Sequence, residues 1–438
     1  METHRTVDEV FGVNRDLPLN YVVRKEVDEK FIDSLSRNQH IVIFGSSKQG
    51  KTSLRKKCLE DKDAIVVACQ NKWSLAELHS AILKTAGFNV KQSIEKTVAG
   101  SHKVIAGVAA KAKIPLVTEG SGKAEYERER ATTEKETLKA LELDPNDPND
   151  IIRALEEIEF RQFIVLEDFH YLPDDTQRDF SFSLKTFHEN SKVSFIIVGV
   201  WREENRLIGF NGDLTDRVLS VDVDTWSTNS LDEVIDAGGA LLNVGFHTDF
   251  RANLLAQCFD SVHLVQEACR RACRKAGVFE TQDQMKIVGG GLDVKELIGE
   301  VVSEQASRYQ GFLMGFSAGF QETDLEMPRW VVYALLCSPV DQLEKGLRLR
   351  RISAMIKAKH PKGKDLNNGN ITQILNSASS LQNKKGTRPL IIAYDNSNTS
   401  LHVVDKGFLI WLSTQNIDEI LDDYDMPARL TQQEMGNL

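Results

Sequence analysis

Features that mark membrane and secreted proteins are absent from this chain of 438 residues. No run of eighteen apolar residues occurs in it, and its start, Met1–Arg5, carries charge where a signal segment would be apolar. We therefore expect a cytoplasmic protein without a membrane partner. Its composition, with 41% hydrophobic and 27% charged residues, is typical of a globular chain that buries a sizeable core.

Cysteine and several chemical motifs are also scarce. The six cysteines form no Cys-x-x-Cys pair, so we predict reduced core residues; Cys269 and Cys273, one helical turn apart, lack the second ligand pair that a metal site needs. No repeat period and no nuclease, protease or deaminase motif is present. The Asn-Lys-x-Asp signature of guanine-binding proteins is missing as well, so any nucleotide that the chain binds is expected to carry adenine and not guanine.

A complete phosphate-binding loop follows an apolar strand near the N-terminus. The strand is Ile41–Phe44, and the loop over Gly45–Thr52 reads Gly-Ser-Ser-Lys-Gln-Gly-Lys-Thr. Glycines let the backbone wrap a β-phosphate with its N–H groups, the lysine places a positive charge beside the β and γ oxygens, and the threonine hydroxyl ligates Mg²⁺. We predict that ATP and Mg²⁺ bind through Gly45, Ser46, Ser47, Lys48, Gln49, Gly50, Lys51, Thr52 and Ser53.

The segments after the loop alternate between strand and helix. Ala64–Cys69 is a continuous apolar run typical of a buried parallel strand, and a helix follows from about Ser74 to Ala86. Over about residues 89–149 this pattern breaks, and we predict an inserted β segment followed by a charged helix. It could be a mobile surface insertion, a contact with another subunit or a partner, or, as a third alternative, a membrane-inserting segment. Asp150 is predicted to cap a helix over Ile151–Ile158.

Two carboxylates end the next apolar strand. Phe163–Leu166 runs directly into Glu167 and Asp168, which is the pattern of a Walker B motif. One acid would hold the Mg²⁺ shell, together with Thr52, and the other would polarise the attacking water.

Two arginines follow later in the same region. Arg202 comes after the apolar strand Ser194–Val200, at the edge where α/β sheets bind ligands, and is a candidate sensor of the γ-phosphate. Arg217 precedes another apolar run and is a candidate arginine finger for a neighbouring subunit. Surface ion pairs are the alternative role for both. The catalytic candidates are therefore Glu167, Asp168, Arg202 and Arg217.

The segments Val22–Glu26 and Leu166–His170 resemble motifs of STAND NTPases and of origin-recognition ATPases, both of the AAA+-like group. The resemblance covers about residues 15–280 without the insertion. It implies an α/β fold with an ASCE-type parallel sheet, a small helical lid, Arg24 beside the nucleotide, and ATP-dependent assembly of a homo-oligomer. Arg202 would match the STAND arginine after the fourth strand, and Arg217 the AAA+ finger.

Two features depart from those families. Glu167 stands where the first acid is usually aspartate, which leaves open which of Glu167 and Asp168 lies nearest the metal and indicates slow hydrolysis. The lid segment Ser261–Gln266 has no arginine at the place of a second sensor, which favours a switch over a motor.

The C-terminal part differs in charge from the rest. The whole chain carries a net charge of −10, yet residues 328–412 hold thirteen lysines and arginines against five acidic residues. The apolar spacing of this part predicts three helices, which are Trp330–Cys337, a helix containing Leu349 to Ile356, and Ile371–Leu381. Two strands follow, Leu390–Asp395 and Leu401–Asp405, and then the apolar segment Phe408–Leu412. This pattern predicts a winged-helix domain.

Two roles are open for this domain. It could contact double-stranded DNA through the basic residues Arg348, Arg350, Arg351, Lys357, Lys384 and Lys385. It could instead close over the nucleotide as an intramolecular lock, as winged helices do in STAND proteins. The expected domains are residues 1–224 (P-loop ATPase core), 225–288 (helical lid), 289–327 (helical linker), 328–414 (winged helix) and 415–438 (tail).

Together these patterns predict a weakly hydrolysing assembly ATPase of the STAND/AAA+ type whose nucleotide state controls oligomerisation. Since no effector motif is found in the chain, the effector is expected to be a separate protein, with bacterial defence as the suggested context. A DNA-loading or transposition-type ATPase is the first alternative. A nucleotide-stabilised scaffold without turnover is the second.

Overall fold

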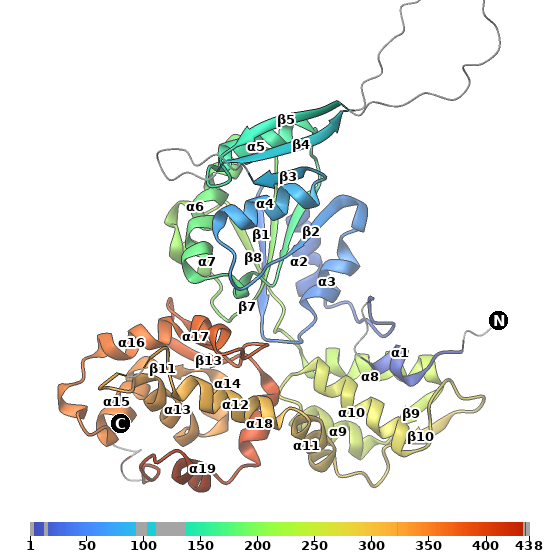
Figure 1. Cartoon of the computed structure of the whole chain (residues 1–438). Coiled ribbons are helices and arrows are strands. Elements are labelled where there is room, and N and C mark those ends of the chain that lie inside the picture. Colours follow the sequence, from blue (N-terminus) through green and yellow to red (C-terminus); the bar gives the residue numbers. More distant parts are fainter. Residues whose placement is uncertain are drawn as a thin grey trace, which may run out of the picture.

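The computed structural model of the chain describes residues 4–12, 16–92, 103–110, 137–321, 323–431 and 434. Three parts are visible in Figure 1: a sheet-containing core, a helical lid next to it, and a C-terminal helical module that lies below the core beside the lid.

A five-stranded parallel sheet, in the order β2-β6-β7-β1-β8, forms the centre of the core. Its strands are β1 (His40–Gly45), β2 (Ala64–Ala68), β6 (Phe163–Glu167), β7 (Phe195–Val200) and β8 (Val218–Asp222). Every residue of β1 and β7 is buried, which explains their continuous apolar sequences, since a parallel strand has no solvent face when helices cover both sides. The predicted P-loop type of α/β sheet is confirmed.

Helices cover both faces of this sheet (Figure 1). On one face α2 (Lys25–Leu35) and α3 (Lys51–Cys58) pack against Ile41 and Ile43 of β1. On the other face Val42 and Phe44 belong to the cluster that includes side chains of three further helices. These helices are α4 (Leu75–Thr85), α5 (Pro148–Glu157) and α6 (Asp174–Asn190). The alternation along β1 follows the period of two of an extended strand.

The start of α5 differs from the prediction. Asp147, not Asp150, is its N-cap: the Asp147 side chain accepts a hydrogen bond from the Asn149 N–H at 2.9 Å. Asp150 lies within the first turn and accepts one from the Asp144 N–H at 2.7 Å. The helix begins earlier because Pro148, whose fixed φ suits the first helical position, directly follows a residue that can cap.

The predicted β insertion is present as a separate antiparallel sheet above the core. It consists of β3 (Asn89–Gln92), β4 (Val104–Ala110) and β5 (Thr137–Leu143), with β4 in the middle. The charged helix expected after it falls mostly on residues 111–136, which lie outside the described residues, and Thr137–Leu143 is a strand.

The lid contains three helices and a small parallel sheet. These are α8 (Thr228–Leu242), α9 (Thr248–Gln257), α10 (Val262–Lys275), β9 (Val244–Phe246) and β10 (Lys286–Val288). The short N-terminal helix α1 (Val7–Phe11) packs against α8 and α10. Its fully buried Phe11 ring fills the space left at Gly238, where a Cβ would lie 2.2 Å from the ring.

The C-terminal module is winged-helix-like, with a three-stranded sheet in the order β11-β13-β12. Two helices, α11 (Val294–Ser303) and α12 (Ala306–Ser317), lead into it. Its own elements are α13 (Met327–Cys337), α14 (Val340–Lys345), β11 (Leu347–Arg348), α15 (Leu349–Lys359), α16 (Asn368–Asn376), α17 (Ala378–Lys384), β12 (Ile392–Asp395), β13 (Ser400–Val403), α18 (Lys406–Ser413) and α19 (Ile417–Asp423).

One detail of this module corrects the sequence analysis, and another assigns a segment whose structure the sequence left open. The single helix predicted over Ile371–Leu381 is broken at Ser377 into α16 and α17. The apolar segment Phe408–Leu412 after the hairpin is part of a helix, α18, which Asp405 caps. A short apolar run fits a buried helix as well as a strand, and its tertiary neighbours decide between them.

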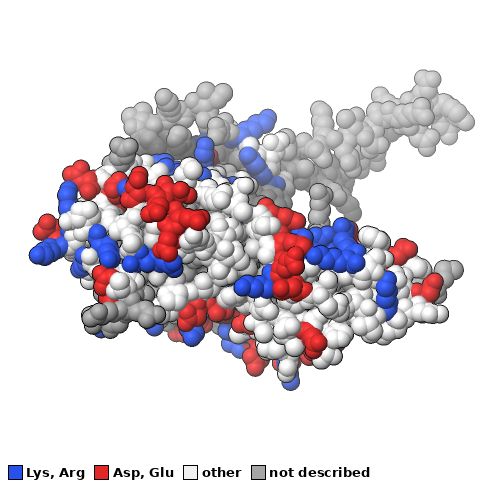
Figure 2. All heavy atoms as spheres, turned by 90° about the horizontal axis from the view of Figure 1, so that it is seen from below, with Lys and Arg blue, Asp and Glu red and all other residues white. Residues whose placement is uncertain are grey.

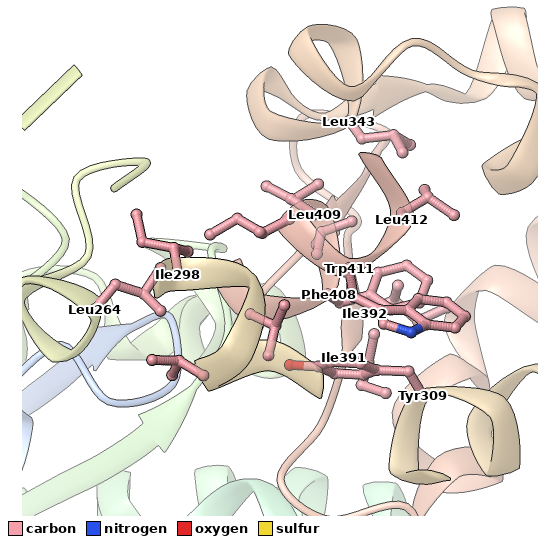
Figure 3. Packing of buried hydrophobic residues seen from close by; sticks show 14 of the residues in the cluster. Leu264, Ile298, Tyr309, Leu343, Ile391, Ile392, Phe408, Leu409, Trp411 and Leu412 are labelled. Carbon is pink, nitrogen blue, oxygen red and sulfur yellow. The ribbon is translucent and has the colours of Figure 1, made fainter. Parts of the chain in front are cut away.

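Helix α18 joins the lid side of the molecule to the C-terminal module. Figure 3 shows Phe408, Leu409 and Trp411 of α18 between Ile298 of α11 and Tyr309 of α12. The Tyr309 and Phe408 rings lie 5.5 Å apart, edge to face. One hydrophobic cluster therefore runs from α1 and the lid into the C-terminal module. No helix within the described ranges is long and apolar enough to span a membrane.

The close packing at the end of β7 can be tested with Gly199→Ala. A Cβ there would lie 1.6 Å from a ring carbon of the buried Trp201, which cannot move without disturbing the core. Because overpacking forces such shifts, we expect the free energy of unfolding to fall by about 1–3 kcal/mol in a denaturant titration. The control is Gly212→Ala, where a Cβ meets nothing within 4 Å. Equal stability of the two variants would contradict this packing.

Candidate nucleotide site

The phosphate loop lies at the C-terminal edge of the sheet, between β1 and α3. Gly45 and Gly50 have positive φ angles of 147° and 89°, which only glycine adopts readily. A Cβ at Gly45 would also lie 2.8 Å from Val223 Cγ2. Gly50 is the N-cap of α3, so the N-terminal N–H groups of this helix face the loop, as anion binding requires.

Lys51 is buried inside the loop. Its Nζ donates to the backbone carbonyls of Gly45, at 3.1 Å, and Ser46, at 2.5 Å. Burial lowers the pKa of Lys51 to about 8, although the surrounding carboxylates oppose this shift. The loop therefore holds its cation at a cost in free energy that an anionic ligand would offset.

The two acids at the end of β6 have different partners. Glu167 accepts from Arg55 Nε at 2.9 Å, and its other oxygen lies 3.5 Å from Thr52 Oγ1. Asp168 is in a left-handed conformation with φ 58° and lines the pocket. Burial raises the pKa of both carboxyls, opposed mainly by Arg55 at Glu167 and by Lys51 at Asp168.

Oxygen ligands of this kind fit Mg²⁺, and the geometry puts Glu167 next to the threonine hydroxyl. Among the described residues, no group of three or more His, Cys, Asp or Glu side chains could hold a metal ion. A magnesium ion here would therefore take most of its ligands from phosphate and water, as is usual for this ion. The six cysteines form no disulfide, and four of them are buried as expected of core residues, whereas Cys58 and Cys337 are only partly buried.

A cavity of about 350 Å³ adjoins the loop. Its other walls come from residues 18–24, from Trp226, and from the start of α10 with Val262, His263 and Gln266. Arg24 lines it as predicted: its guanidinium stacks on the Trp226 ring at 4.1 Å and donates to the Val223 carbonyl at 2.6 Å. Apolar and aromatic walls beside a phosphate loop are what a nucleotide base needs.

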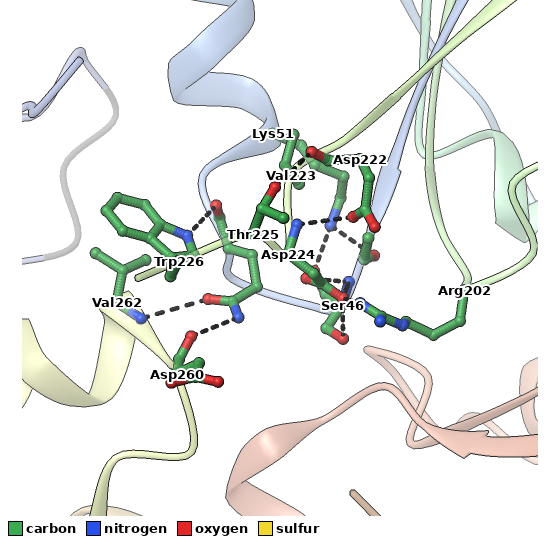
Figure 4. Close-up of polar contacts among 12 residues, drawn as sticks. Ser46, Lys51, Arg202, Asp222, Val223, Asp224, Thr225, Trp226, Asp260 and Val262 are labelled. Atoms are coloured by element: carbon green, nitrogen blue, oxygen red, sulfur yellow. Dashed lines mark hydrogen bonds and ion pairs between the residues drawn. The ribbon is translucent and has the colours of Figure 1, made fainter. Parts of the chain in front are cut away.

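The lid holds the loop by direct hydrogen bonds (Figure 4). The fully buried Gln49 donates to the Asp260 carbonyl at 2.9 Å and accepts from the Val262 N–H at 3.3 Å. Lys48 Nζ lies 3.0 Å from His263 Nε2. Burial lowers the pKa of His263 to about 3, so its neutral ring accepts this hydrogen bond.

Arg202 is at the predicted edge but pairs with Asp224 (Figure 4). The Asp224 side chain is only 4% exposed, and it also accepts from the Ser46 N–H at 2.8 Å and from the Ser46 hydroxyl at 2.7 Å. Asp224 thus fixes the start of the loop and the candidate sensor arginine at once.

Arg217 lies at the opposite end of the sheet from its own phosphate loop. Its carbonyl accepts from the N–H of His40, the first residue of β1, whereas the loop follows the last residue of β1. The guanidinium pairs with Glu189 at 3.0 Å. In this geometry Arg217 cannot serve a nucleotide bound at its own phosphate loop.

The C-terminal module touches the phosphate loop directly. The Ser47 N–H donates to the Val404 carbonyl at 2.8 Å. Leu390 and Val404 are buried in the same hydrophobic cluster as Phe169 and Trp201 of the core. Polar contacts surround this cluster: Ser397 donates to Glu203, Asn383 to the His170 carbonyl, and Ser380 to Asp174.

The candidate DNA-binding residues have different surroundings. Arg348, Arg350 and Arg351 line one pocket, together with Lys345. Lys357 Nζ instead donates to Asn368 at 2.9 Å, while Lys384 lies over the Phe320 ring and Lys385 follows it at the end of α17. Asn370, in the first turn of α16, is engaged in the capping box of that helix.

Sequence reasoning missed the residues that come to the loop from elsewhere: Arg55, Asp224, Trp226, His263 and Val404. Only Asp224 had a usable signal, since it follows a buried strand at the same sheet edge as Glu167. The others contact the loop through tertiary packing that no local pattern encodes.

No protein-family model matches the chain, and no curated protein does so either. Among solved structures, the Walker-type ATPase PABY2304 of Pyrococcus abyssi has a TM-score of 0.54 and 12% identity, covering 92% of this chain and 99% of that one. The ORC1 protein of Aeropyrum pernix in complex with DNA has a TM-score of 0.42 and 9% identity, covering 96% and 99%. The RuvB Holliday junction branch migration motor of Thermotoga maritima has a TM-score of 0.33 and 8% identity, and the match covers 93% of this chain and 96% of that one.

The first of these likenesses agrees with the sheet order, the phosphate loop and the lid described above. The chain therefore has the fold of an AAA+-type P-loop ATPase, which is a nucleotide-binding fold.

The low pKa of Lys51 leads to a test of the site. Only the ammonium form attracts phosphate, and the free protein loses this proton as the pH rises through about 8. We expect ATP affinity to be level near pH 7 and to fall above pH 8 by up to about tenfold per pH unit. Calorimetric titrations between about pH 7 and 9.5, with circular dichroism as the control for folding, measure this. A lysine with an ordinary pKa would give a flat profile over the same range.

Proposed function

We propose that this chain is an ATP-dependent assembly switch that hydrolyses ATP slowly and acts on a separate partner protein. The supporting observation is the hydrogen bond from the Ser47 N–H of the phosphate loop to the Val404 carbonyl of the C-terminal module. One of the N–H groups that cradle phosphates in such loops is already used to hold another module. Nucleotide binding and docking of the module thus share the loop.

The contact is suited to switching because it is local and modest. A neutral hydrogen bond contributes about 1 kcal/mol, whereas the surrounding buried side chains, such as Leu390, keep the module in register on the core. A change in the loop on nucleotide binding would be transmitted to the module without a long pathway. The surface exposed by its movement is where we place the partner and the assembly contact.

Slow hydrolysis is supported by the state of the catalytic candidates. Glu167 is paired with Arg55, and Arg202 is paired with Asp224, so neither is free to act on a water molecule or a γ-phosphate. Mg²⁺ held by Thr52 and Glu167 would neutralise phosphate charge. Arg217 would complete the site of a neighbouring copy.

The proposal is tested by the mass of the purified protein in solution, measured by light scattering with and without ATP and Mg²⁺. For the wild type we expect a defined larger species only when ATP and Mg²⁺ are both present. The Arg217→Ala variant should not form it, because the Arg217 guanidinium of the wild type would reach a neighbour's nucleotide. Arg429→Ala, which also breaks an exposed ion pair, with Asp418, is the matched control and should assemble normally. A constant mass despite ATP binding would refute the assembly switch, and assembly without phosphate release would favour the scaffold.

A second candidate function, contact with the backbone of duplex DNA, is favoured by one observation. Lys345, Arg348, Arg350 and Arg351 line a pocket at the N-terminus of α15. Within the described residues none of the four has an ion-pair partner, and Arg351 Nε has no hydrogen-bond partner. On the face seen in Figure 2, basic and acidic residues lie in small groups without a continuous basic stripe. Such a pocket suits phosphate contacts more than base reading.

The DNA function predicts a salt dependence. Replacing Lys345, Arg350 and Arg351 by alanine should lower the slope of log affinity against log salt concentration for a duplex by about 2 to 3, because each phosphate contact contributes about 0.9. Fluorescence anisotropy with labelled duplex measures this, and the Lys384→Ala, Lys385→Ala double variant is the control. Equal slopes for all three proteins would contradict the function.

A further inference from the structure

One cation at the rim of the nucleotide pocket has no counter-ion within the described part of the chain. Arg388 lies between α17 and β12 of the C-terminal module and is exposed. Its guanidinium stacks on the ring of Tyr171 at 4.7 Å. Among the described residues it has neither a hydrogen bond nor an ion pair.

The position of Arg388 is at the phosphate end of the pocket. Tyr171 and Asp168, which both line the pocket, belong to the short segment that follows the strand β6. Pro389, the next residue after Arg388, lines it as well. Arg388 is also close enough to Asp168 to lower the pKa of that carboxyl, after the larger effects of burial and Lys51.

The other arginines near the pocket already have partners. Arg202 pairs with Asp224, and Arg206 contacts Gln177 at 3.1 Å. In the lid, Arg270 and Arg271 pair with acidic residues at 2.8 and 2.6 Å. The start of α10, where the sequence has no arginine, places His263 and Gln266 at the pocket. Arg24 lines the pocket but is buried and donates to the Val223 carbonyl. Of the arginines that the described residues place in or beside the pocket, Arg388 alone has neither a hydrogen bond nor an ion pair.

We infer that Arg388 is the specificity-determining residue that distinguishes ATP from ADP, by binding the γ-phosphate from the C-terminal module of the same chain. The backbone N–H groups of the phosphate loop wrap the β-phosphate, which both nucleotides share, so a further cation that faces the γ-phosphate adds discrimination between them. Stacking on Tyr171 holds the planar guanidinium at the rim, and its free N–H groups match phosphate oxygens in a forked geometry. This inference rests on the proposed function, and it gives the module a direct reading of the nucleotide state.

The test compares affinities for ATP and ADP, each measured by calorimetry with Mg²⁺ present. For Arg388→Ala we expect ATP to bind about tenfold or more weakly, as loss of a charge-assisted contact requires, and ADP affinity to stay within about twofold. Arg388→Lys keeps the charge and should recover part of the ATP affinity. Lys385→Ala, an exposed cation three residues away, is the control and should change neither value.

The outcomes separate this inference from the proposed function. An unchanged ratio of ATP to ADP affinity in both Arg388 variants, with wild-type binding and assembly intact, would overturn the inference alone. If Arg388→Ala lowers the affinities for ATP and ADP equally, and Arg388→Lys recovers neither, the inference is overturned too, because such a result indicates a structural role for Arg388. If wild type and Lys51→Ala bind ATP equally, the proposed nucleotide function itself fails.

Discussion

The polar backbone of the phosphate loop needs partners, and the three modules of this protein meet where they supply them. The Ser46 N–H donates to Asp224 of the segment after β8, the Ser47 N–H donates to the Val404 carbonyl of the C-terminal module, and the Gln49 carbonyl accepts from Trp226 Nε1, just before helix α8 of the lid. Lys51 satisfies two of the loop's own carbonyls from inside. Since buried N–H and C=O groups cost free energy when unpaired, each of these hydrogen bonds favours docking of the module that supplies the partner.

This arrangement makes the nucleotide pocket a junction of modules. Its walls come from the N-terminal segment, the core, the lid and, at Pro389, the C-terminal module. A ligand that changes the hydrogen bonds of the loop necessarily changes the free energy of docking of the neighbouring modules, which is the basis of coupling between sites. The apolar contacts at Leu390 and Val404 keep the modules together while the polar contacts at the loop can exchange.

The sequence predicted most of the core and part of the site. The parallel sheet, the phosphate loop, the Walker B acids and Arg24 are carried by short segments whose local pattern is sufficient: apolar runs for buried strands, and glycines where positive φ is needed. The predictions that were wrong concern where single helices begin and end. The cap at Asp147 and the break at Ser377 depend on neighbouring residues that compete with the simplest local pattern.

By itself, the sequence determined that this chain builds a nucleotide-binding α/β core followed by a basic helical module. Phosphate binding depends on residues adjacent in the chain, so their order is enough to define it. Only the tertiary structure decided what surrounds the loop: that Arg202 is paired with Asp224, that Arg217 faces away from its own loop, and that Val404 and Arg388 of a distant module lie at the pocket. These contacts join residues up to several hundred positions apart, and only the packing of the modules against each other brings them together.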